Sequence, residues 1–467
     1  PLSPLGFTNG LFDFWRTSGA AKVRRTVLCA SGRIWADNDN GTFVDVTGAF
    51  SILPENNVSL ETFFGLLILS YETNPASQVL RFDQTTLAAL GGAPPNGRFL
   101  RTWRSRLWIT GILATPDRLR GSVIDDPENW AAGPGSVTID IDQGDQDPIG
   151  NTALFPGLFG RMIVAKRRSL HEVTPSGTTF AVRPLTEGHG CISHYAVVGM
   201  DNDVIYPSDR GIHTVGMTVK LGEVETAYLS YPIQNFYQEN VSYDRGANMR
   251  AIYVPEMSHY LLAMTSKSSS RNNLVLAYNF ALGEWSVWDQ NVSAFSKFVD
   301  STDGRKTKVL IADDTGRVGI LDTTKTGRAV TWFGSRVTMQ FTTGIIYPLG
   351  VGKEVTFRRL KVFYRPQVTG SNLDVSYFVN GAFVADLEFN MAPIQSGSLI
   401  GSAVIGVDRI GGGGVVKHVT RELRGLGSAI ELVFTHTPVA DNDDCELYGF
   451  IIEYEYSGET YLPKAKL

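Results

Sequence analysis

DIDQGDQDPIGNTALFPGLFGRMIVAKRRSLHEVTPSGTTF, at residues 140–180, and GCISHYAVVGMDNDVIYPSDRGIHTVG, at residues 190–216, are two segments with the same pattern. Each contains an apolar strand, at 162–164 and at 196–198, followed by more polar strands. The turns at 175–177, 201–203 and 209–211 hold Pro, Gly, Asn and Asp, which favour tight turns between strands. A meander of this kind cannot bury its apolar strand alone, so the pattern predicts neighbouring units of the same design, as in a β-propeller.

The apolar strand recurs along the chain at intervals of 34 to 65 residues. Four short strands with their turns need roughly 40 to 50 residues, as in known propeller blades. The longer intervals leave room for inserted loops, at 131–150 and 229–250. We therefore predict six or seven blades, with the apolar strand innermost in each. The strands are marked by Leu28, Ile68, Ile109, Ile163, Val197, Leu262 and Leu310.

The repeating units share a pattern of apolar and polar residues, but not the same residues at corresponding positions. The chain has no Asp-box of the sialidase kind, and its single Trp288-Asp289 pair is not a periodic signature. A sheet sandwich with many hairpins would alternate in a similar way. The spacing favours the propeller, and the sandwich stays open as an alternative.

Near residues 327–336 the spacing of the predicted strands changes, and the following roughly 130 residues contain seven longer strands. This number and length of strands is typical of a β-sandwich of jelly-roll type. Asn380-Gly381 is a strong hairpin signal. In the last strand, Ile452, Tyr454 and Tyr456 alternate with two glutamates, which predicts one face in the core and one in water. The glycine-rich stretch 397–414 predicts a mobile or partner-ordered loop.

The predicted organisation is therefore all-β, with three parts. Residues 1–22 form an N-terminal arm or a lone edge strand, 23–332 a six- or seven-bladed β-propeller, and 333–467 a C-terminal β-sandwich, jelly-roll-like. At 467 residues the chain is too long for one ordinary core. It has no run of eighteen apolar residues, so no membrane-spanning segment is expected.

Charge and cysteine content narrow the classes of function. The chain has 42 basic and 47 acidic residues and a net charge of −5, which argues against a protein whose affinity comes mainly from gripping phosphates. It does not exclude a surface past which nucleic acid slides. Cys29, Cys191 and Cys445 are odd in number and far apart, so we expect no disulfide framework and a reducing compartment.

Two groups of residues resemble metal sites. Asp140, Asp142, Asp145 and Asp147 could supply carboxylates to a hard cation, but the spacing lacks the later Glu and the Gly of an EF-hand, which favours a structural turn. His189, Cys191 and His194 lie within six residues. On a strand the first two share a face and His194 points the other way, so we expect satisfied strand residues rather than zinc ligands.

Basic residues gather at Lys166-Arg167-Arg168 and at Arg358, Arg359, Lys361 and Arg365, the latter beside Phe363 and Tyr364. Alternating cations and aromatic rings can follow a phosphate backbone. The alternative, which we favour, is a solvated face or ion pairs at a subunit interface.

The sequence carries no motif of a catalytic nucleophile, metalloprotease or phosphate-binding loop. Propeller hydrolases bury carboxylates around the central channel, and Asp37, Asp203, Asp313 and Asp314 stand near the ends of the apolar strands. Spacing alone does not bring any two of them to glycosidase distances. We therefore predict no enzyme, and no catalytic, cofactor-binding or metal-ligating residue.

Residues 145–175, 190–215 and 273–289, with 357–365 and 446–455, carry a family resemblance. They resemble virion tail proteins of short-tailed bacteriophages, and among these the tail nozzle, also called the tail tubular or packaged-DNA-stabilising protein. The likeness covers most of residues 26–456 and is weakest before residue 23 and across the two insertions.

This resemblance implies a structural virion protein of the phage tail, assembled in the host bacterial cytoplasm. It implies a homohexameric ring, with portal and adaptor proteins above it and needle, plug or fibre proteins below. The ring would retain packaged double-stranded DNA and form the channel for DNA ejection. Six copies at −5 would carry −30, which is consistent with a wall that does not hold the DNA passing along it. The alternative is a peripheral receptor- or carbohydrate-binding tail propeller, and a glycan-cleaving propeller is a third hypothesis.

Overall fold

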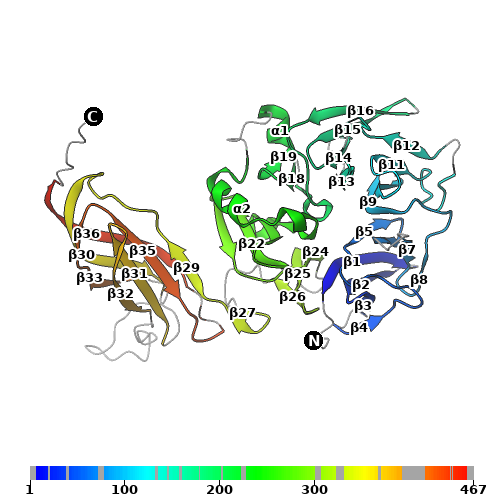
Figure 1. Cartoon of the computed structure of the whole chain (residues 1–467). Helices are drawn as coiled ribbons and strands as arrows, with labels where there is room; N and C mark the ends of the chain where they lie inside the picture. The colour runs from blue at the N-terminus through cyan, green and yellow to red at the C-terminus, as the bar shows by residue number, and fades with distance from the viewer. Residues whose placement is uncertain are drawn as a thin grey trace. The chain divides into compact units, whose positions relative to one another are not determined.

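The structure is a computed structural model of the whole chain (Figure 1). It describes residues 7–18, 21–37, 41–71, 78–131, 135–144, 147–156, 160–177, 179–200, 203–221, 228–299, 307–321, 331–365, 370–391, 416–441, 443 and 445–459. The chain divides into two compact units, Pro1–Thr323 and Thr324–Leu467. The division falls a few residues before the predicted boundary at 332. Each unit is described by itself below.

Unit 1 is a β-propeller, which confirms the predicted fold class. Its described residues form seven antiparallel sheets, so the count of six or seven blades resolves to seven. We number the blades in chain order. Blade 1 holds β1 (Thr8–Ser18), β2 (Ala21–Ala30), β3 (Arg33–Asp37) and β4 (Phe43–Asp45); blade 2 holds β5 (Val58–Phe63), β6 (Leu66–Tyr71), β7 (Gln78–Phe82) and β8 (Leu87–Ala89); blade 3 holds β9 (Gly97–Trp103), β10 (Arg106–Ile112), β11 (Arg118–Gly121) and β12 (Val137–Asp140).

The remaining blades follow the same order along the chain. Blade 4 holds β13 (Asn151–Leu154), β14 (Met162–Lys166), β15 (Leu170–Ser176) and β16 (Thr179–Thr186); blade 5 holds β17 (Val198–Gly199), β18 (Val204–Pro207) and β19 (Ile212–Thr214); blade 6 holds β20 (Arg250–Val254), β21 (His259–Thr265), β22 (Asn272–Asn279) and β23 (Glu284–Trp288); blade 7 holds β24 (Ala294–Val299), β25 (Thr307–Ala312) and β26 (Val318–Leu321). Each sheet is therefore built from consecutive strands.

The first strands of the blades contact one another in order around an axis, and β24 of blade 7 contacts β1 of blade 1. Figure 1 shows this closure, with the green β24 beside the blue β1. We call the joint between blades 7 and 1 the seam. It is held by side chains, because no strand of blade 7 pairs with a strand of blade 1 in the described residues. Leu28 and Phe298 share one buried cluster there, and the Arg24 guanidinium lies 3.6 Å from the centre of the Phe298 ring.

In six of the blades the predicted apolar strand is the second strand and not the innermost, which corrects our expectation; Val197 of blade 5 lies just before the first strand of its sheet. Leu28, Ile68, Ile109, Ile163, Leu262 and Leu310 lie on β2, β6, β10, β14, β21 and β25. These strands are packed between neighbouring blades on both faces and are therefore uniformly apolar. The first strands carry polar residues such as Asn9, Ser59 and Arg101, because one of their sides faces the axis.

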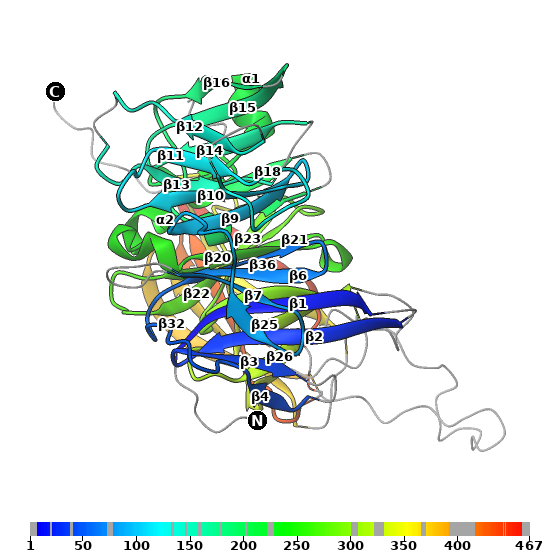
Figure 2. The same ribbon diagram turned by 90° about the vertical axis from the view of Figure 1, so that its right-hand side faces the viewer.

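Residues 8–18 form a propeller strand and not the predicted arm. β1 pairs with β2 over most of its length, and Figure 2 shows the two strands running side by side. Phe14 is fully buried in the cluster between blades 1 and 2. The mixture of polar and aromatic residues here belongs to an axis-facing strand, so the segment is part of the propeller.

Blade 5 departs from the pattern. The expected strand at 196–198 is only β17, two residues long, preceded by the 3-10 helix η1 (His194–Ala196). In the long insertion before blade 6 the chain forms α1 (Val215–Leu221), η3 (Tyr231–Ile233), α2 (Gln234–Asn240) and η4 (Tyr243–Asn248). Tyr237 of α2 is fully buried against blades 5 and 6. None of the described helices is long and apolar enough to cross a membrane.

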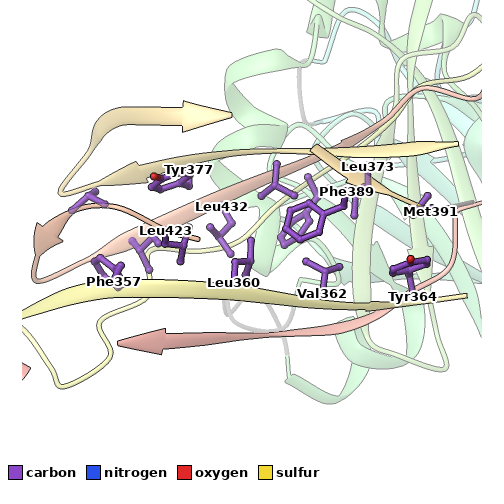
Figure 3. Close-up of a cluster of buried hydrophobic side chains, with 14 of the residues drawn as sticks. Phe357, Leu360, Val362, Tyr364, Leu373, Tyr377, Phe389, Met391, Leu423 and Leu432 are labelled. Atoms are coloured by element: carbon purple, nitrogen blue, oxygen red, sulfur yellow. The ribbon is translucent and has the colours of Figure 1, made fainter. Parts of the chain in front are cut away.

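Unit 2 is a β-sandwich preceded by the short hairpin β27 (Thr331–Trp332) and β28 (Ser335–Arg336). One sheet has the order β29 (Met339–Thr342), β35 (Ile430–His436), β31 (Asn372–Val379) and β32 (Ala382–Asn390). In the other, β30 (Lys353–Tyr364) pairs with β33 (Lys417–Glu422), β34 (Leu426–Gly427) and β36 (Leu447–Glu459). The core lies between the two sheets, and Figure 3 shows Leu360 and Val362 of β30 facing Leu373 and Leu432 of the other sheet.

The predicted hairpin at Asn380-Gly381 is confirmed. Both residues have positive φ, 49° and 80°, which matches the tight hairpin turn that Asn-Gly favours. The Asn380 side chain also accepts hydrogen bonds from the backbone N–H groups of Ser428 and Ala429. The glycine-rich stretch 397–414 lies outside the described residues.

The predicted alternation on the last strand holds only in part. Ile452 packs against the sandwich core, but Tyr454 and Tyr456 are 38% and 58% exposed. β36 is the longest described strand and an edge strand of its sheet, and its pairing with β30 contains register shifts, so its alternation does not keep the two tyrosines in the core. Glu453 and Glu455 face water as expected.

Candidate functional site

The first strands of the propeller surround a cavity of about 190 Å³, which we call the axial cavity. Six of the seven blades contribute to it. Its lining includes residues 9–12 of β1, 58–60 of β5, Arg101 of β9, His194 and Tyr195 of η1, Arg250 of β20 and residues 294–295 of β24. The major groove of DNA alone is about 12 Å wide, so this cavity cannot conduct a duplex.

Arg250 is the central charged residue of the axial cavity. It is buried, and burial lowers the pKa of its guanidinium to about 10. Nη2 donates to Asn57 Oδ1 at 2.6 Å and to the Asn9 carbonyl oxygen at 3.4 Å. The guanidinium also lies 4.2 Å from the centre of the Tyr195 ring. Arg250 therefore connects blade 6 to the first two blades across the axis.

His194 and Arg101 make two further connections across the axis. His194 Nδ1 accepts the backbone N–H of Leu154 at 3.2 Å, and its Nε2 lies 3.4 Å from Ser59 Oγ. Arg101 Nε donates to the Leu154 carbonyl oxygen and its Nη1 pairs with Glu61. Burial raises the pKa of Glu61, although Arg101 opposes the shift. These bonds join blades 2 to 5 at the axis.

A second cavity, of about 290 Å³, shares His194 and Tyr195 with the axial cavity. We call it the Tyr243 pocket. Its apolar part includes Phe99, whose ring stacks obliquely on His194 with centroids 5.0 Å apart. Its charged side chains are Arg98, Arg167 and Asp244. The full lining is Arg98, Phe99, Ile149, Thr152, Arg167, Ile192, Ser193, His194, Tyr195, Tyr243, Asp244 and Ala247.

The third cavity, of about 560 Å³, adjoins the second, because Ile149 and Arg167 line both. We call it the Glu187 pocket. It is lined by Asp142, Asp147, Pro148, Ile149, Arg167, Arg168, Ser169 and Glu187. Three carboxylates and two guanidiniums therefore line it.

The predicted acidic cluster does not converge. Asp140 forms two hydrogen bonds to the Arg118 guanidinium, which hold the pKa of Asp140 below its usual range. Asp147 accepts the backbone N–H of Ile149 in a turn. Asp142 lines the Glu187 pocket, and Asp145 lies outside the described residues. Within the described ranges, no group of three or more His, Cys, Asp or Glu side chains is placed to hold a metal ion.

The predicted trio His189, Cys191 and His194 separates. His189 stacks on His213, with ring centres 4.1 Å apart, and its Nε2 contacts the Tyr206 hydroxyl. The Cys191 thiol donates to the Ser193 carbonyl oxygen, and burial raises its pKa to about 12. The three side chains therefore have separate partners, with His194 Nδ1 accepting from the Leu154 backbone, and do not converge on one point. Cys29, Cys191 and Cys445 form no disulfide with one another.

The four other candidate carboxylates lie in turns, away from the axis. Asp37 accepts the N–H of Gly41, and Asp203 accepts those of Val204 and Gly216. The Asp313 carboxylate pairs with Arg317 in the β25–β26 hairpin, and Asp314 lies 3.8 Å from Arg271. They follow second and third strands or stand in hairpins, so they do not line the axial cavity.

The predicted basic groups are mainly in ion pairs. Lys166 is buried, with Nζ 2.8 Å from Asp117 Oδ1 and donating to the Asp142 carbonyl oxygen. On β30, Arg358, Arg359 and Arg365 pair with Glu455, Glu453 and Glu446, on or next to the neighbouring strand β36. Lys361 lies over the Phe363 ring. The β30 group is therefore a face with cross-strand pairs, and not a row of free cations.

Sequence reasoning missed the residues that line the two pockets, except for Arg167, Arg168, Asp142, Asp147 and His194. Arg98 lies on β9, Tyr195 on η1, and the adjacent Tyr243 and Asp244 on η4, and these three segments meet only in the folded ring. A signal was present in the insertion before blade 6, whose YDRGAN segment forms η4. A long loop in a repeat protein often carries the binding face.

Comparison with known proteins gives few relations. No family model and no curated protein matches the chain. Among solved structures, the exo-β-1,3-galactanase of Phanerochaete chrysosporium with β-1,3-galactotriose is 11% identical, and the alignment covers 94% of this chain and 95% of that one, with a TM-score of 0.28. The BBS1N structure in complex with ARL6DN is 12% identical, with coverages of 70% and 96% and a TM-score of 0.42.

These comparisons contradict the prediction that the chain is not an enzyme, because the galactanase is a glycoside hydrolase. The absence of a local sequence motif does not distinguish an enzyme from a protein without catalytic activity. The catalytic carboxylates of a propeller hydrolase come from different blades, so no short motif contains both. At 10 to 12% identity no activity is carried over to this chain.

Two buried histidines predict an acid-sensitive propeller. Burial lowers the pKa of His194 well below its usual value, and burial with the nearby His189 lowers that of His213 to about 2. Unfolded histidines bind protons below about pH 6.5 and these native ones do not, so acidification favours the unfolded state. We expect each to remove about 1.4 kcal/mol of stability per pH unit below pH 6.5.

The measurement is urea unfolding at pH 7.0, 6.0 and 5.5. His213→Asn should flatten the dependence of stability on pH, whereas His418→Asn, at an exposed position of unit 2, should leave it unchanged. Equal slopes for the His213 variant and the wild type would contradict the role of this histidine.

Proposed function

We propose that the chain is a structural virion protein of the phage tail, a nozzle in which identical chains form a ring. The ring retains packaged DNA, forms the channel for its ejection and seats needle or fibre proteins. The proposal starts from the sequence resemblance of residues 26–456. It requires a channel between copies, because the axial cavity of one propeller, at about 190 Å³, is too small to admit a duplex.

The observation that carries the proposal is an uncovered apolar surface on unit 2. Tyr347, Leu349 and Val351 are 42%, 37% and 78% exposed, and Tyr454 and Tyr456 of β36 are also exposed. We call these five residues the β36 patch. The Tyr454 hydroxyl donates to the Pro348 carbonyl oxygen, which joins the two segments.

β36 is also an edge strand. In the described residues it pairs only with β30, so its outer edge has no strand partner. A long edge strand with exposed apolar side chains is an aggregation hazard unless something covers it. A neighbouring copy of the chain would bury the β36 patch in a ring that closes by rotation. The location of the chain in the phage tail and the hexameric state of the ring are parts of this proposal.

The test is the oligomeric state of the purified chain and its place in the virion. We expect native mass spectrometry and electron microscopy to show a ring with an axial channel that admits a DNA duplex. Antibodies against unit 2 should label the tail tip. A monomer both in solution and in the particle would overturn the proposal.

The double substitution Tyr454→Lys and Tyr456→Lys should shift the chain from ring to monomer without unfolding it, because both side chains are exposed. Phe383→Lys is the matched control: this aromatic side chain is 56% exposed on β32, in the other sheet. A ring that survives the double substitution would show that the β36 patch is not the contact.

A further inference from the structure

The propeller has two adjoining pockets that the nozzle proposal does not use. The Tyr243 pocket has a volume of about 290 Å³ and the Glu187 pocket one of about 560 Å³. The two adjoin, because Ile149 and Arg167 line both. Binding sites for small molecules have roughly 300 to 1,000 Å³. All of the lining residues belong to one propeller, so the site needs no second copy and is independent of the proposed ring.

Arg167 is the group that points to a ligand. In the described parts of the chain its guanidinium forms no hydrogen bond or ion pair, although the side chain is half-buried between the two pockets. Its neighbour Lys166 is fully engaged with Asp117 and Asp142. A guanidinium presents several donors in a fixed plane that matches a carboxylate, so Arg167 is suited to an acidic group of a ligand.

The Tyr243 pocket adds an apolar wall. Phe99, Tyr195 and Tyr243 line it, and the first two are held by edge contacts with each other, with ring centres 6.1 Å apart. Rigid aromatic rings offer contact area to a flat apolar face at little entropic cost. Asp244 is exposed and forms no hydrogen bond within the described residues, so it can accept hydrogen bonds from ligand hydroxyl groups.

The charges of the two pockets separate the ligand classes. Three guanidiniums, of Arg98, Arg167 and Arg168, face four carboxylates, of Asp142, Asp147, Glu187 and Asp244. The combined surface is therefore slightly negative. A nucleic acid carries a charge on every phosphate and would be repelled by these carboxylates. A ligand with one acidic group and many hydroxyls would meet a partner for each.

We propose that the Tyr243 and Glu187 pockets together bind an oligosaccharide that contains one acidic sugar. Arg167 binds the carboxylate of that sugar, and the apolar face of its ring packs on Tyr243 and Phe99. The adjoining neutral sugars extend into the Glu187 pocket, where carboxylates and Arg168 bind their hydroxyl groups.

The probe is a disaccharide of one glucuronic acid linked to one galactose. Its control is the same disaccharide with the carboxyl group reduced to hydroxymethyl. Calorimetric titration of the full chain should give saturable binding of the acidic form with Kd near or below about 1 mM, and at least about tenfold weaker binding of the reduced form.

Variants assign the contacts. Arg167→Gln should abolish the preference for the acidic form, whereas Tyr243→Leu should weaken both forms by a similar factor. Arg365→Gln, which removes a cation paired with Glu446 in unit 2, should change neither. Circular dichroism and the thermal transition show that each variant is folded.

Three results would overturn the proposal. The first is the absence of saturable binding of the acidic disaccharide. The second is equal affinity for the acidic and the reduced forms, or an unchanged preference in Arg167→Gln. The third is tighter binding of a short oligothymidylate or of inorganic phosphate at the same site, which would assign it to nucleotides or to simple anions. None of these outcomes bears on whether the chain forms a ring.

Discussion

Leu28→Ala should destabilise the propeller by about 2 to 5 kcal/mol, the usual cost of truncating a fully buried leucine. Leu28 is completely buried at the seam, among residues of blades 1 and 7. The seam differs from the other joints, because no covalent connection between the two blades supports it. The same loss of packing should therefore also open the ring locally.

Hydrogen exchange measures this opening. In Leu28→Ala, the amides of β1 and β24 should lose protection before those of β9 and β13, since local opening follows the weakest packing. Leu282→Ala is the control: Leu282 is 70% exposed in the β22–β23 turn, and its loss should cost within about 0.5 kcal/mol. Uniform loss of protection around the ring would show that the seam is no weaker than the other joints.

Arg250→Ala should cost at least about 3 kcal/mol of propeller stability, because it removes four hydrogen bonds donated by a buried guanidinium, and hydrogen bonds to charged groups contribute about 1.5 to 3 kcal/mol each. The affected acceptors are Asn57 Oδ1 and the carbonyl oxygens of Asn9, Ala247 and Met249. Arg250→Lys keeps the positive charge but loses the planar fork that reaches two blades at once. We expect it to fall between the alanine variant and the wild type.

Urea unfolding of the full chain, followed by hydrogen exchange at β5 and β20, gives the measurement. Arg245→Ala is the matched control, because Arg245 is an exposed arginine of η4 with a single hydrogen bond to the Ser270 carbonyl oxygen. It should cost within about 0.5 kcal/mol. If Arg250→Ala were as mild as Arg245→Ala, the bonds across the axis would be dispensable for stability.

The blades could be predicted from the sequence because their signals are local. Strands and turns follow from apolar runs and from turn residues such as Gly177 between β15 and β16, whose φ of 61° favours glycine. The interval between apolar strands then indicates the repeat. The order of strands within a blade is not local. The second strand is the most apolar because it is packed on both faces, so the apolar pattern does not predict which strand lies innermost.

The axis-facing strand and the pockets could not be predicted, for a related reason. β1 combines Asn9, Asp13 and Arg16 with aromatic residues, and this mixture makes sense only when one side faces a polar cavity and the other a neighbouring blade. The pocket residues Arg98, Arg167 and Tyr243 are separated by about 70 residues each along the chain. No spacing rule connects them, because the circular order of the blades brings them together.

The alternation of apolar and acidic residues on the last strand also could not predict that Tyr454 and Tyr456 are exposed. Their alternation with Glu453 and Glu455 is that of a half-buried strand, and Ile452 does pack inward. Burial of a residue also depends on the neighbouring strands: β36 is an edge strand, and its pairing with β30 contains irregular steps that shift the register. Alternation therefore predicts the side on which a residue lies, but not whether anything covers it.

Every sheet of the propeller consists of a single uninterrupted stretch of chain. During synthesis, each blade can consequently assemble as soon as its last strand leaves the ribosome, and it can dock on the one before it without waiting for distant sequence. Ancestral copying or loss of one whole blade would likewise leave the pairing of the others intact. Circular permutants with new ends in any turn between blades should retain every pairing of strands, and only the position of the break in the wheel would move.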